Sequence, residues 1–220
     1  MKEGYCDEIS FDEFIDILTE GKGNQIKKEL REIEKQEKEK TFVIGDLHLD
    51  HSNIIKYCNR PFSSVGEMNK TIINNWNKTI KENDVVYFLG DLSFGKGSQN
   101  ADYWLQKLNG KITVIRGNHD KSKKIKFLDN FVLKYKDHQF LLTHNPLNVS
   151  KQWNGWIIHG HCHNNNLKNC PFINGKMKTI NVGVEVIGYK PLELDQLFKL
   201  NFENIERMET INSKPIFKRR

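Results

Sequence analysis

Short apolar runs alternate with stretches of helical periodicity from Thr41 onward. The clearest runs are rich in β-branched and aromatic residues and predict strands at 41–44, 85–89, 112–115 and 140–142. Later runs predict two more strands, at 156–158 and 179–182, and Asn174-Gly175 is typical of a hairpin turn. Because strands alternate with helices, the pattern indicates an α/β layered fold.

Apolar residues recur at helical spacing between these strands. Ser64 and Glu67 form a capping box, which predicts the start of a helix. This helix carries an apolar stripe at i+4 intervals, made of Met68, Ile72, Trp76 and Ile80. Two further helices are predicted at 101–108 and 192–200. Such stripes indicate contacts with a protein core rather than with a cofactor.

Residues 1–40 are expected to form a helical extension, which leaves 41–220 as the main domain. A capping box that begins at Ser10 predicts a short helix ending at Gly21, and 25–40 reads as a second helix amid alternating charges. We expect the extension to pack on the main domain. Pairing with another chain, which would form an oligomer, and covering a functional site are the alternatives.

The composition limits the class of protein. A length of 220 residues with 37% apolar content suffices for one substantial core. No apolar run approaches the roughly 20 residues that span a bilayer, and the first residues lack the apolar stretch of a signal peptide. We therefore expect a cytoplasmic protein without a membrane partner. The net charge of +6 favours anionic partners, without separating nucleic acids from nucleotides.

The four cysteines do not suggest a structural metal or a disulfide framework. Cys6, Cys58, Cys162 and Cys170 form no C-x-x-C pair, so we interpret them as reduced thiols. Cys162 lies between two histidines, but alternate side chains of an extended segment point to opposite sides. We expect Cys162 to point away from any site that these histidines form.

Five polar fragments stand where predicted strands end. They supply seven candidate metal ligands, which are Asp46, His48, Asp91, Asn118, His144, His161 and His163. Oxygen and nitrogen donors of this kind suit Mn, Fe, Zn or Ni. Seven ligands are too many for one ion, but they form two nearly complete sets if one carboxylate is shared. Paired metals roughly 3.5–4 Å apart are a common device for phosphoryl-group hydrolysis.

The order of these fragments resembles the calcineurin-like metallophosphoesterase superfamily. That pattern is D-x-H, G-D, G-N-H-D/E, a lone His and G-H-x-H, and this sequence matches it from Asp46 to His163. The residues after His48, together with Cys58-Asn59-Arg60-Pro61-Phe62, look like a subgroup of small microbial phosphoesterases. The resemblance implies two mixed β-sheets packed face to face and flanked by helices. It also implies that the main domain is catalytic.

The resemblance assigns ligands to two ions. Asp46, His48, Asp91 and His163 would hold the first ion, and Asp91, Asn118, His144 and His161 the second. A bridging ligand has to be anionic because two divalent cations repel each other strongly, which suits Asp91. Mn is the expected metal, with Fe, Zn and Ni as alternatives.

Four further residues are expected near the reacting group. His119 would protonate the leaving oxygen or hydrogen-bond the phosphoryl group, and Asp120 would either orient it or only shape the loop. His51 and Arg60 are candidate substrate contacts, since arginine offers a bidentate fork to phosphate oxygens. The alternative for Arg60 is pairing with a carboxylate.

These inferences predict a dinuclear phosphohydrolase. Metal-bound hydroxide would attack a small phosphodiester or phosphomonoester, or a nucleotide, with a diester preferred. One alternative is a nuclease that acts on nucleic acid ends with the same metals. Another is a catalytically silent binding scaffold, which the complete set of ligands disfavours.

Overall fold

The computed structural model of the chain describes residues 28, 39–95 and 98–218. Residues 40–220 form one compact unit, which is described below. Apart from residues 28, 39 and 40, the two helices predicted within 1–40 lie outside the described residues, so the helical extension stays a prediction.

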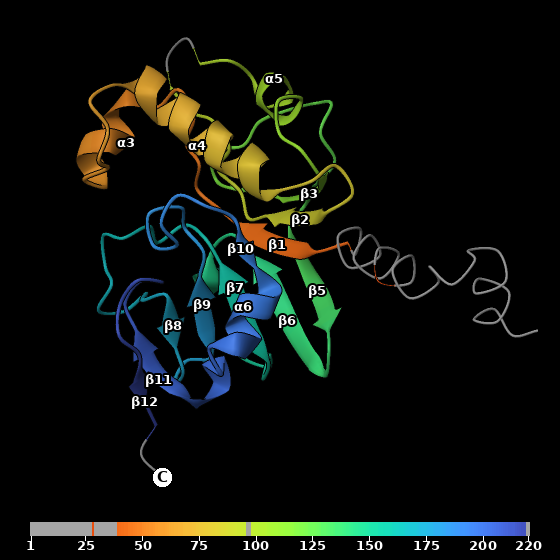
Figure 1. Ribbon diagram of the computed structural model, residues 1–220, viewed down its shortest axis with the longest axis vertical. Coiled ribbons are helices and arrows are strands. Elements are labelled where there is room, and N and C mark those ends of the chain that lie inside the picture. Colours follow the sequence, from red (N-terminus) through yellow and green to blue (C-terminus); the bar gives the residue numbers. More distant parts are fainter. Residues whose placement is uncertain (1–27, 29–38, 96–97, 219–220) are drawn as a thin grey trace, which may run out of the picture. The chain divides into compact units, whose positions relative to one another are not determined.

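The first sheet has five strands in the order β10-β1-β2-β3-β4 (Figure 1). Strands β1 to β4 run parallel to one another, and the edge strand β10 pairs antiparallel with β1. The bounds are Thr41–Ile44 for β1, Val85–Phe88 for β2, Lys111–Ile115 for β3, Phe127–Leu128 for β4 and Leu192–Glu193 for β10. The three predicted strands in this sheet are therefore confirmed within one residue at their ends.

The second sheet has seven strands in the order β12-β11-β8-β9-β7-β6-β5. Strands β6, β7 and β9 are parallel neighbours, whereas the other pairs are antiparallel. The bounds are Asn130–Tyr135 for β5, His138–Thr143 for β6, Trp156–His159 for β7, Ile173–Asn174 for β8, Thr179–Asn181 for β9, Ile205–Met208 for β11 and Ile216–Phe217 for β12. The predicted hairpin is confirmed, since β8 and β9 pair antiparallel across residues 175–178.

The described helices are few and mostly short. They are α3 (Ser52–Tyr57), α4 (Val65–Thr79), α5 (Ala101–Leu105) and α6 (Leu194–Lys199), with the 3-10 turns η1 (Pro146–Asn148) and η2 (Phe202–Asn204). Figure 1 shows α4 lying along the five-stranded sheet, on the side away from the seven-stranded sheet. This two-sheet arrangement confirms the predicted fold class.

Helix α4 forms as its sequence predicts. The Ser64 hydroxyl accepts a hydrogen bond from the Glu67 backbone N–H at 3.2 Å, and the Glu67 carboxylate accepts one from the Ser63 N–H at 2.8 Å. The side chains of Met68, Ile72 and Trp76 are almost completely buried. The stripe therefore attaches α4 to the core.

Two predicted helices differ from the observed ones. The helix predicted at 192–200 begins at Leu194, because Leu192 and Glu193 pair with β1 as strand β10. The helix predicted at 101–108 ends at Leu105 and continues as turns. Residues 192–193 and 107–108 form sheet and turn hydrogen bonds instead of helical ones, and local periodicity does not predict this difference.

One apolar core joins the two sheets. Val43 and Phe88 of the first sheet, and Ile158 and Ile180 of the second, have no exposed surface and belong to the same cluster. A backbone bridge between Gly45 and Gly183 also connects the end of β1 to the segment after β9. The carboxyl ends of β1, β2, β3, β6 and β7 consequently face a common region. Among the described residues, no helix has the length and apolarity needed to cross a membrane.

Candidate metal centre

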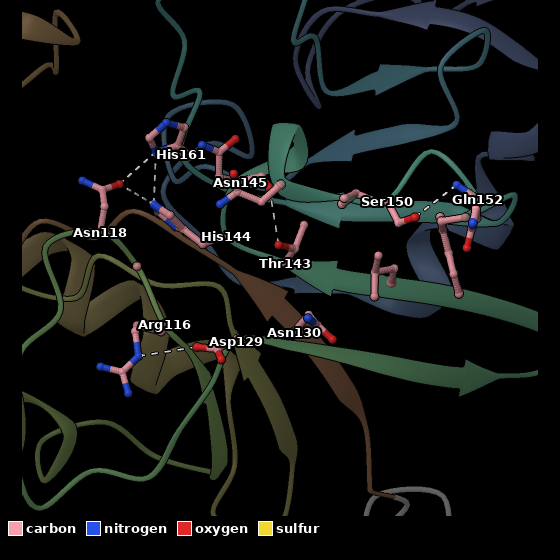
Figure 2. Close-up of a pocket in the computed structure, with 15 residues that line it drawn as sticks. Arg116, Asn118, Asp129, Asn130, Thr143, His144, Asn145, Ser150, Gln152 and His161 are labelled. Atoms are coloured by element: carbon pink, nitrogen blue, oxygen red, sulfur yellow. Dashed lines mark hydrogen bonds and ion pairs between the residues drawn. The ribbon is translucent and has the colours of Figure 1, made fainter.

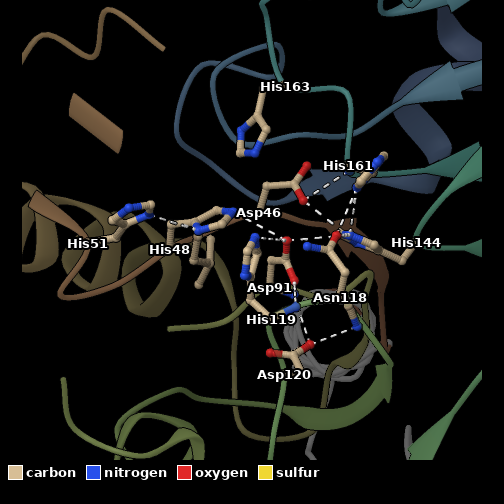
Figure 3. A network of polar contacts seen from close by, with 12 residues as sticks. Asp46, His48, His51, Asp91, Asn118, His119, Asp120, His144, His161 and His163 are labelled. Carbon is tan, nitrogen blue, oxygen red and sulfur yellow. Dashed lines mark hydrogen bonds and ion pairs between the residues drawn. The ribbon is translucent and has the colours of Figure 1, made fainter. Parts of the chain in front are cut away.

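All seven predicted ligands follow the carboxyl ends of strands and gather in one place (Figure 3). Those of the first sheet are Asp46 and His48 after β1, Asp91 after β2 and Asn118 after β3. His144 follows β6, and His161 and His163 follow β7 in the second sheet. The shared core holds these strand ends together, so residues more than 100 positions apart contact one another.

The ligand loops have an uncommon backbone conformation. Asp46, His48, Asp91, His161 and His163 all have positive φ angles, between 48° and 68°. Residues other than glycine rarely adopt this left-handed region, and its cost is of order 1–3 kcal/mol each. Five such residues at one site indicate that the surrounding structure imposes the conformation. This strain turns the side chains toward a common centre.

Two glycines allow the first-sheet loops to approach each other. Gly90 has a φ of +88°, and a Cβ atom there would lie 2.6 Å from the Cα atom of Gly117. A Cβ atom on Gly117 would collide with the carboxylate and backbone of Asp91. Glycine before Asp91 and before Asn118 is therefore a steric requirement of the site.

The first cluster consists of Asp46, His48 and His163, whose ligand atoms lie within 4.8 Å of one another. Asp46 Oδ2 and His48 Nε2 are buried, and neither has a hydrogen-bond partner among the described residues, although His48 Nε2 lies 3.4 Å from Asp91 Oδ2. Burial raises the pKa of Asp46 to about 6 and lowers the pKa of His48 to about 4. Buried polar atoms without partners are costly, and a divalent cation would satisfy both of them. The donor set of this cluster therefore fits a metal ion.

The second cluster consists of Asn118, His144 and His161, which contact one another. The Nδ1–H of His144 donates to the Leu89 carbonyl at 2.7 Å, so Nε2 faces the centre. Burial lowers the pKa of His144, but the nearby carboxylates of Asp91 and Asp46 outweigh burial and raise this pKa to about 8. This Nε2 lies 2.9 Å from Asn118 Oδ1 and 3.2 Å from His161 Nδ1. The two ring nitrogens and the amide oxygen thus face one another, with His161 Nδ1 2.9 Å from Asn118 Oδ1. A cation between them would be coordinated by all three atoms once the rings have lost the protons on these nitrogens.

Asp91 lies between the two clusters. Its Oδ2 is 3.4 Å from His48 Nε2 and 3.4 Å from His144 Nε2, while Oδ1 accepts a hydrogen bond from the His119 backbone N–H at 2.9 Å. Burial raises the pKa of Asp91, but the nearby rings of His144 and His48 outweigh burial and hold the pKa well below its usual range. The carboxylate is therefore charged at neutral pH, as a bridging ligand has to be.

Asp46 of the first cluster also lies close to His144 of the second. Asp46, Asp91 and His144 form a group whose ligand atoms lie within 4.8 Å of one another. Asp46 Oδ1 also accepts a hydrogen bond from the His161 backbone N–H at 3.0 Å. The two clusters are thus adjacent, and the carboxylates of Asp46 and Asp91 lie between them.

Arg60 is not placed to contact a substrate, which corrects the sequence-based expectation. Its guanidinium has no exposed surface and lies 2.7 Å from Glu185 Oε1. It also donates to the backbone carbonyls of Leu47 at 2.7 Å and Asp46 at 2.8 Å. Arg60 instead pairs with a carboxylate, which was the alternative interpretation. Its guanidinium thus fixes the loop after β1, which carries Asp46 and His48.

Glu185 is a residue that the sequence analysis missed. Its carboxylate oxygens lie 3.1 and 3.2 Å from His163 Nδ1. Burial raises the pKa of Glu185, but the hydrogen bond with His163 and the charge of Arg60 outweigh it and lower the pKa to about 2. A carboxylate on one ring nitrogen fixes the tautomer and directs the other nitrogen toward a metal. Its position far along the chain from Arg60 left no local signal.

Asp120 does not orient the His119 ring, which is a second correction. Oδ2 accepts hydrogen bonds from the backbone N–H groups of Asp91 at 2.8 Å and Gly117 at 2.9 Å, and Oδ1 accepts one from Leu92 at 3.0 Å. The carboxylate therefore ties the loop after β2 to the loop after β3. This is the loop role that the sequence left open, and it is structural rather than catalytic.

His119 and His51 lie at the edge of the metal centre. The His119 ring is about one-third exposed, and its Nε2 lies 4.0 Å from Asp91 Oδ2. His51 Nδ1 is 3.3 Å from His48 Nδ1. Phe94, which is 40% exposed, lies between the two histidines, with ring centroids 4.2 Å from His119 and 4.9 Å from His51. Both histidines can therefore reach a group bound at the candidate centre.

The cysteines behave differently from one another. Burial and a hydrogen bond with Cys170 raise the pKa of Cys162, which is consistent with the expected bystander. Cys58 is buried and forms a third possible ligand group with His163 and Glu185. Because Glu185 contacts Nδ1 of His163, we interpret this group as one that orients the His163 ring rather than as a separate metal site.

Comparison with known proteins agrees with this geometry. Residues 39–209 match the family model described as calcineurin-like phosphoesterase, which covers more than half of the chain. The chain has two mixed sheets with a candidate metal centre at their strand ends, as the resemblance of its motifs implied. The chain belongs to the calcineurin-like phosphoesterase family.

Individual relatives extend over different parts of the chain. The uncharacterized protein MJ1445 of Methanocaldococcus jannaschii is 52% identical over 176 residues, which are 79% of this chain and 97% of that protein. The Gene 66 protein of Mycobacterium phage L5 is 33% identical over 82 residues, 36% of this chain and 39% of that protein. Among solved structures, the protein of unknown function AQ665 from Aquifex aeolicus has the same fold, with a TM-score of 0.56 and 23% identity. That match covers 73% of this chain and 98% of the other.

Proposed function

We propose that this protein is a dinuclear metal-dependent phosphohydrolase that acts on a small phosphodiester, with phosphomonoesters as a second substrate class. The observation that carries the proposal is the position of Asp91, whose Oδ2 lies 3.4 Å from a histidine nitrogen in each of two ligand clusters. Family membership supports the same chemistry. Mn²⁺ is the proposed ion because oxygen and imidazole donors suit it, and Fe, Zn and Ni remain the alternatives.

Bound ions would activate a water molecule as the nucleophile and neutralise charge on the phosphoryl oxygens. The protein's own residues then have distinct roles. Asp91 keeps its negative charge between the two clusters, and Glu185 holds the His163 ring. His119 is close enough to the centre to protonate the leaving oxygen, and His51 is close enough to hydrogen-bond the phosphoryl group.

Hydrolysis assays with defined metals test this proposal. The purified protein, treated with a chelator and reloaded with Mn²⁺, should hydrolyse bis(4-nitrophenyl) phosphate faster than 4-nitrophenyl phosphate. Asp91→Asn should abolish both activities, because a neutral amide cannot bridge two cations. The control is Asp137→Asn, an exposed turn aspartate, which should keep wild-type activity. Retention of activity by Asp91→Asn would show that the bridging assignment is wrong.

A nuclease is the second candidate, because basic residues lie beside the centre. Arg116, Lys121, Lys123 and Lys124 line a hollow of about 570 Å³ next to the Asp120 loop. Such a track could bind the phosphates of an oligonucleotide. Oligonucleotide affinity that falls steeply as salt increases would favour the nuclease, whereas weak binding that depends little on salt would favour the small substrate.

A further inference from the structure

A cavity of about 760 Å³ opens beside the metal centre (Figure 2). Its wall is formed by the loop after β3, the start of β5 and the segment that follows β6 as far as Trp153. Three candidate metal ligands, Asn118, His144 and His161, also line it. A group bound in this cavity would therefore lie next to a phosphoryl group held at the metals.

Side-chain amides dominate the cavity wall. Five of them line it, namely Asn118, Asn130, Asn145, Asn148 and Gln152. The amides of Asn130, Asn148 and Gln152 are exposed and have no hydrogen-bond partner in the part of the chain that the structure describes. An amide offers two donors and an acceptor, the combination that matches the edges of nucleobases and the hydroxyls of sugars.

The remaining wall argues against a lipid-like substrate. Only Leu141, Val149 and Trp153 contribute large apolar side chains among the described lining residues, so an acyl chain would face mostly polar groups. Trp153 is half-buried and offers aromatic surface, on which a flat heterocycle can stack. Arg116, about half exposed, places its guanidinium on the same wall, with its Nε 3.7 Å from Oδ1 of Asp129, which also lines the cavity. Amides, an aromatic ring and a guanidinium together suit a nucleoside.

The position of His119 indicates which part of a substrate the cavity would hold. His119 contacts Phe94 and His48, whereas the cavity is lined by His144 and His161. A leaving group that takes its proton from His119 would depart on the Phe94 side. The substituent that stays on phosphorus would then point into the cavity.

We propose that this cavity binds the nucleoside of a nucleotide phosphodiester, on the side of phosphorus that is not displaced. The inference rests on the proposed phosphohydrolase function and adds the substrate class. It predicts that the enzyme gains specificity from the group retained on phosphorus, with Asn148 and Gln152 as hydrogen-bonding contacts.

A matched pair of substrates tests the cavity. Thymidine 5′-(4-nitrophenyl phosphate) and methyl 4-nitrophenyl phosphate are both diesters with the same leaving group, and they differ only in the retained alcohol. With the Mn²⁺-loaded enzyme, kcat/KM for the thymidine ester should be at least about tenfold higher. Asn148→Ala and Gln152→Ala should each lower the ratio of the two values about fivefold, as expected for one lost hydrogen bond. Gln139→Ala removes an exposed amide of β6 outside the cavity and should preserve the ratio.

The outcomes separate this inference from the proposed function. Equal kcat/KM for the two esters, or the wild-type ratio in both cavity variants, would overturn the nucleoside assignment while the phosphohydrolase function stands. If neither ester is hydrolysed with any metal, the proposed function fails, and calorimetry with thymidine 5′-monophosphate and Mn²⁺ decides the cavity alone. Binding that weakens about fivefold in Gln152→Ala would then support the assignment. Absent binding, or equal affinity in the variant, would overturn it.

Discussion

Arg60 and Glu185 form a buried ion pair, with 2.7 Å between the guanidinium and the carboxylate and at most 1% exposure of either side chain. Arg60 also binds the carbonyls of Asp46 and Leu47, while Glu185 binds His163. The pair thus connects the loop after β1 to the loop after β7. One buried ion pair therefore fixes the relative position of two ligand loops that come from different sheets.

Removing the charge of Glu185 should weaken metal binding. We predict that Glu185→Gln lowers metal affinity by about 10- to 100-fold, because the amide no longer fixes the His163 ring with a charge. Isothermal titration of the metal-free protein with Mn²⁺ measures this. Glu206→Gln, an exposed glutamate on β11, is the matched control and should bind as wild type does. Equal affinities in the two variants would mean that Glu185 does not position a ligand.

Breaking the ion pair should destabilise the fold. We predict that Arg60→Met lowers the free energy of unfolding by about 3–5 kcal/mol, because it leaves the buried Glu185 carboxylate without its guanidinium partner and with His163 alone. Adding Glu185→Leu to Arg60→Met should recover part of this loss, since neither charge of the pair is then left buried without the other. Urea denaturation of the metal-free proteins measures all three values. Strictly additive losses would indicate that the two side chains do not interact.

Metal removal should lower thermal stability. Among the described residues, the centre holds buried atoms of Asp46 and His48 that have no hydrogen-bond partner, which a cation would satisfy. At a free metal concentration of 100 times Kd, binding should add about 2.7 kcal/mol to the free energy of unfolding for each independent site. Thermal denaturation with chelator and with increasing Mn²⁺ measures this gain. A midpoint that does not move with Mn²⁺ concentration would contradict a metal centre here.

Gly117 should be irreplaceable for metal binding. We predict that Gly117→Ala abolishes stoichiometric binding, because its Cβ would collide with the Asp91 carboxylate. The matched control is Gly66→Ala in the first turn of α4, where an added Cβ meets nothing within 4 Å. The control should leave metal content unchanged and raise stability by up to about 1 kcal/mol. Metal analysis after gel filtration compares the two, and normal metal content in Gly117→Ala would refute the steric argument.

The contribution of His119 should depend on the leaving group. We predict that His119→Gln lowers kcat by about 10²–10⁴-fold for a diester with an alkoxide leaving group, which needs a proton. The loss should be much smaller for 4-nitrophenolate, which departs without one. Metal content should stay at the wild-type value, because His119 belongs to neither ligand cluster that the described residues form. An equal loss with both leaving groups would assign His119 a role other than proton donation.

The strands that carry the site could be predicted because each is a short apolar run that ends at a polar motif. Strand β1 was predicted with its observed bounds, and β2 and β3 differ by one residue. Strand β5 was missed, since its exposed positions carry Asn130, Val132 and Lys134 and give no uniform apolar run. Strand β10 was read as the start of a helix because two residues carry no periodicity.

The residues that gather at the candidate centre could be predicted from motif order, but the residues that hold them in place could not. Arg60 and Glu185 are 125 positions apart, and a buried ion pair leaves no signal in either local sequence. Asp120 was placed in the right loop, yet its three backbone hydrogen bonds depend on how the loops after β2 and β3 meet. Residues that hold ligands act through tertiary contacts, which local patterns do not encode.

The location of bound metals tests the central claim most directly. A crystal of the Mn²⁺-loaded protein, measured for anomalous scattering at the manganese edge, should show two ions roughly 3.5–4 Å apart on either side of the Asp91 carboxylate. One ion should contact His48 and His163, and the other His144 and His161. A single ion, or two ions that do not share Asp91, would contradict the dinuclear centre.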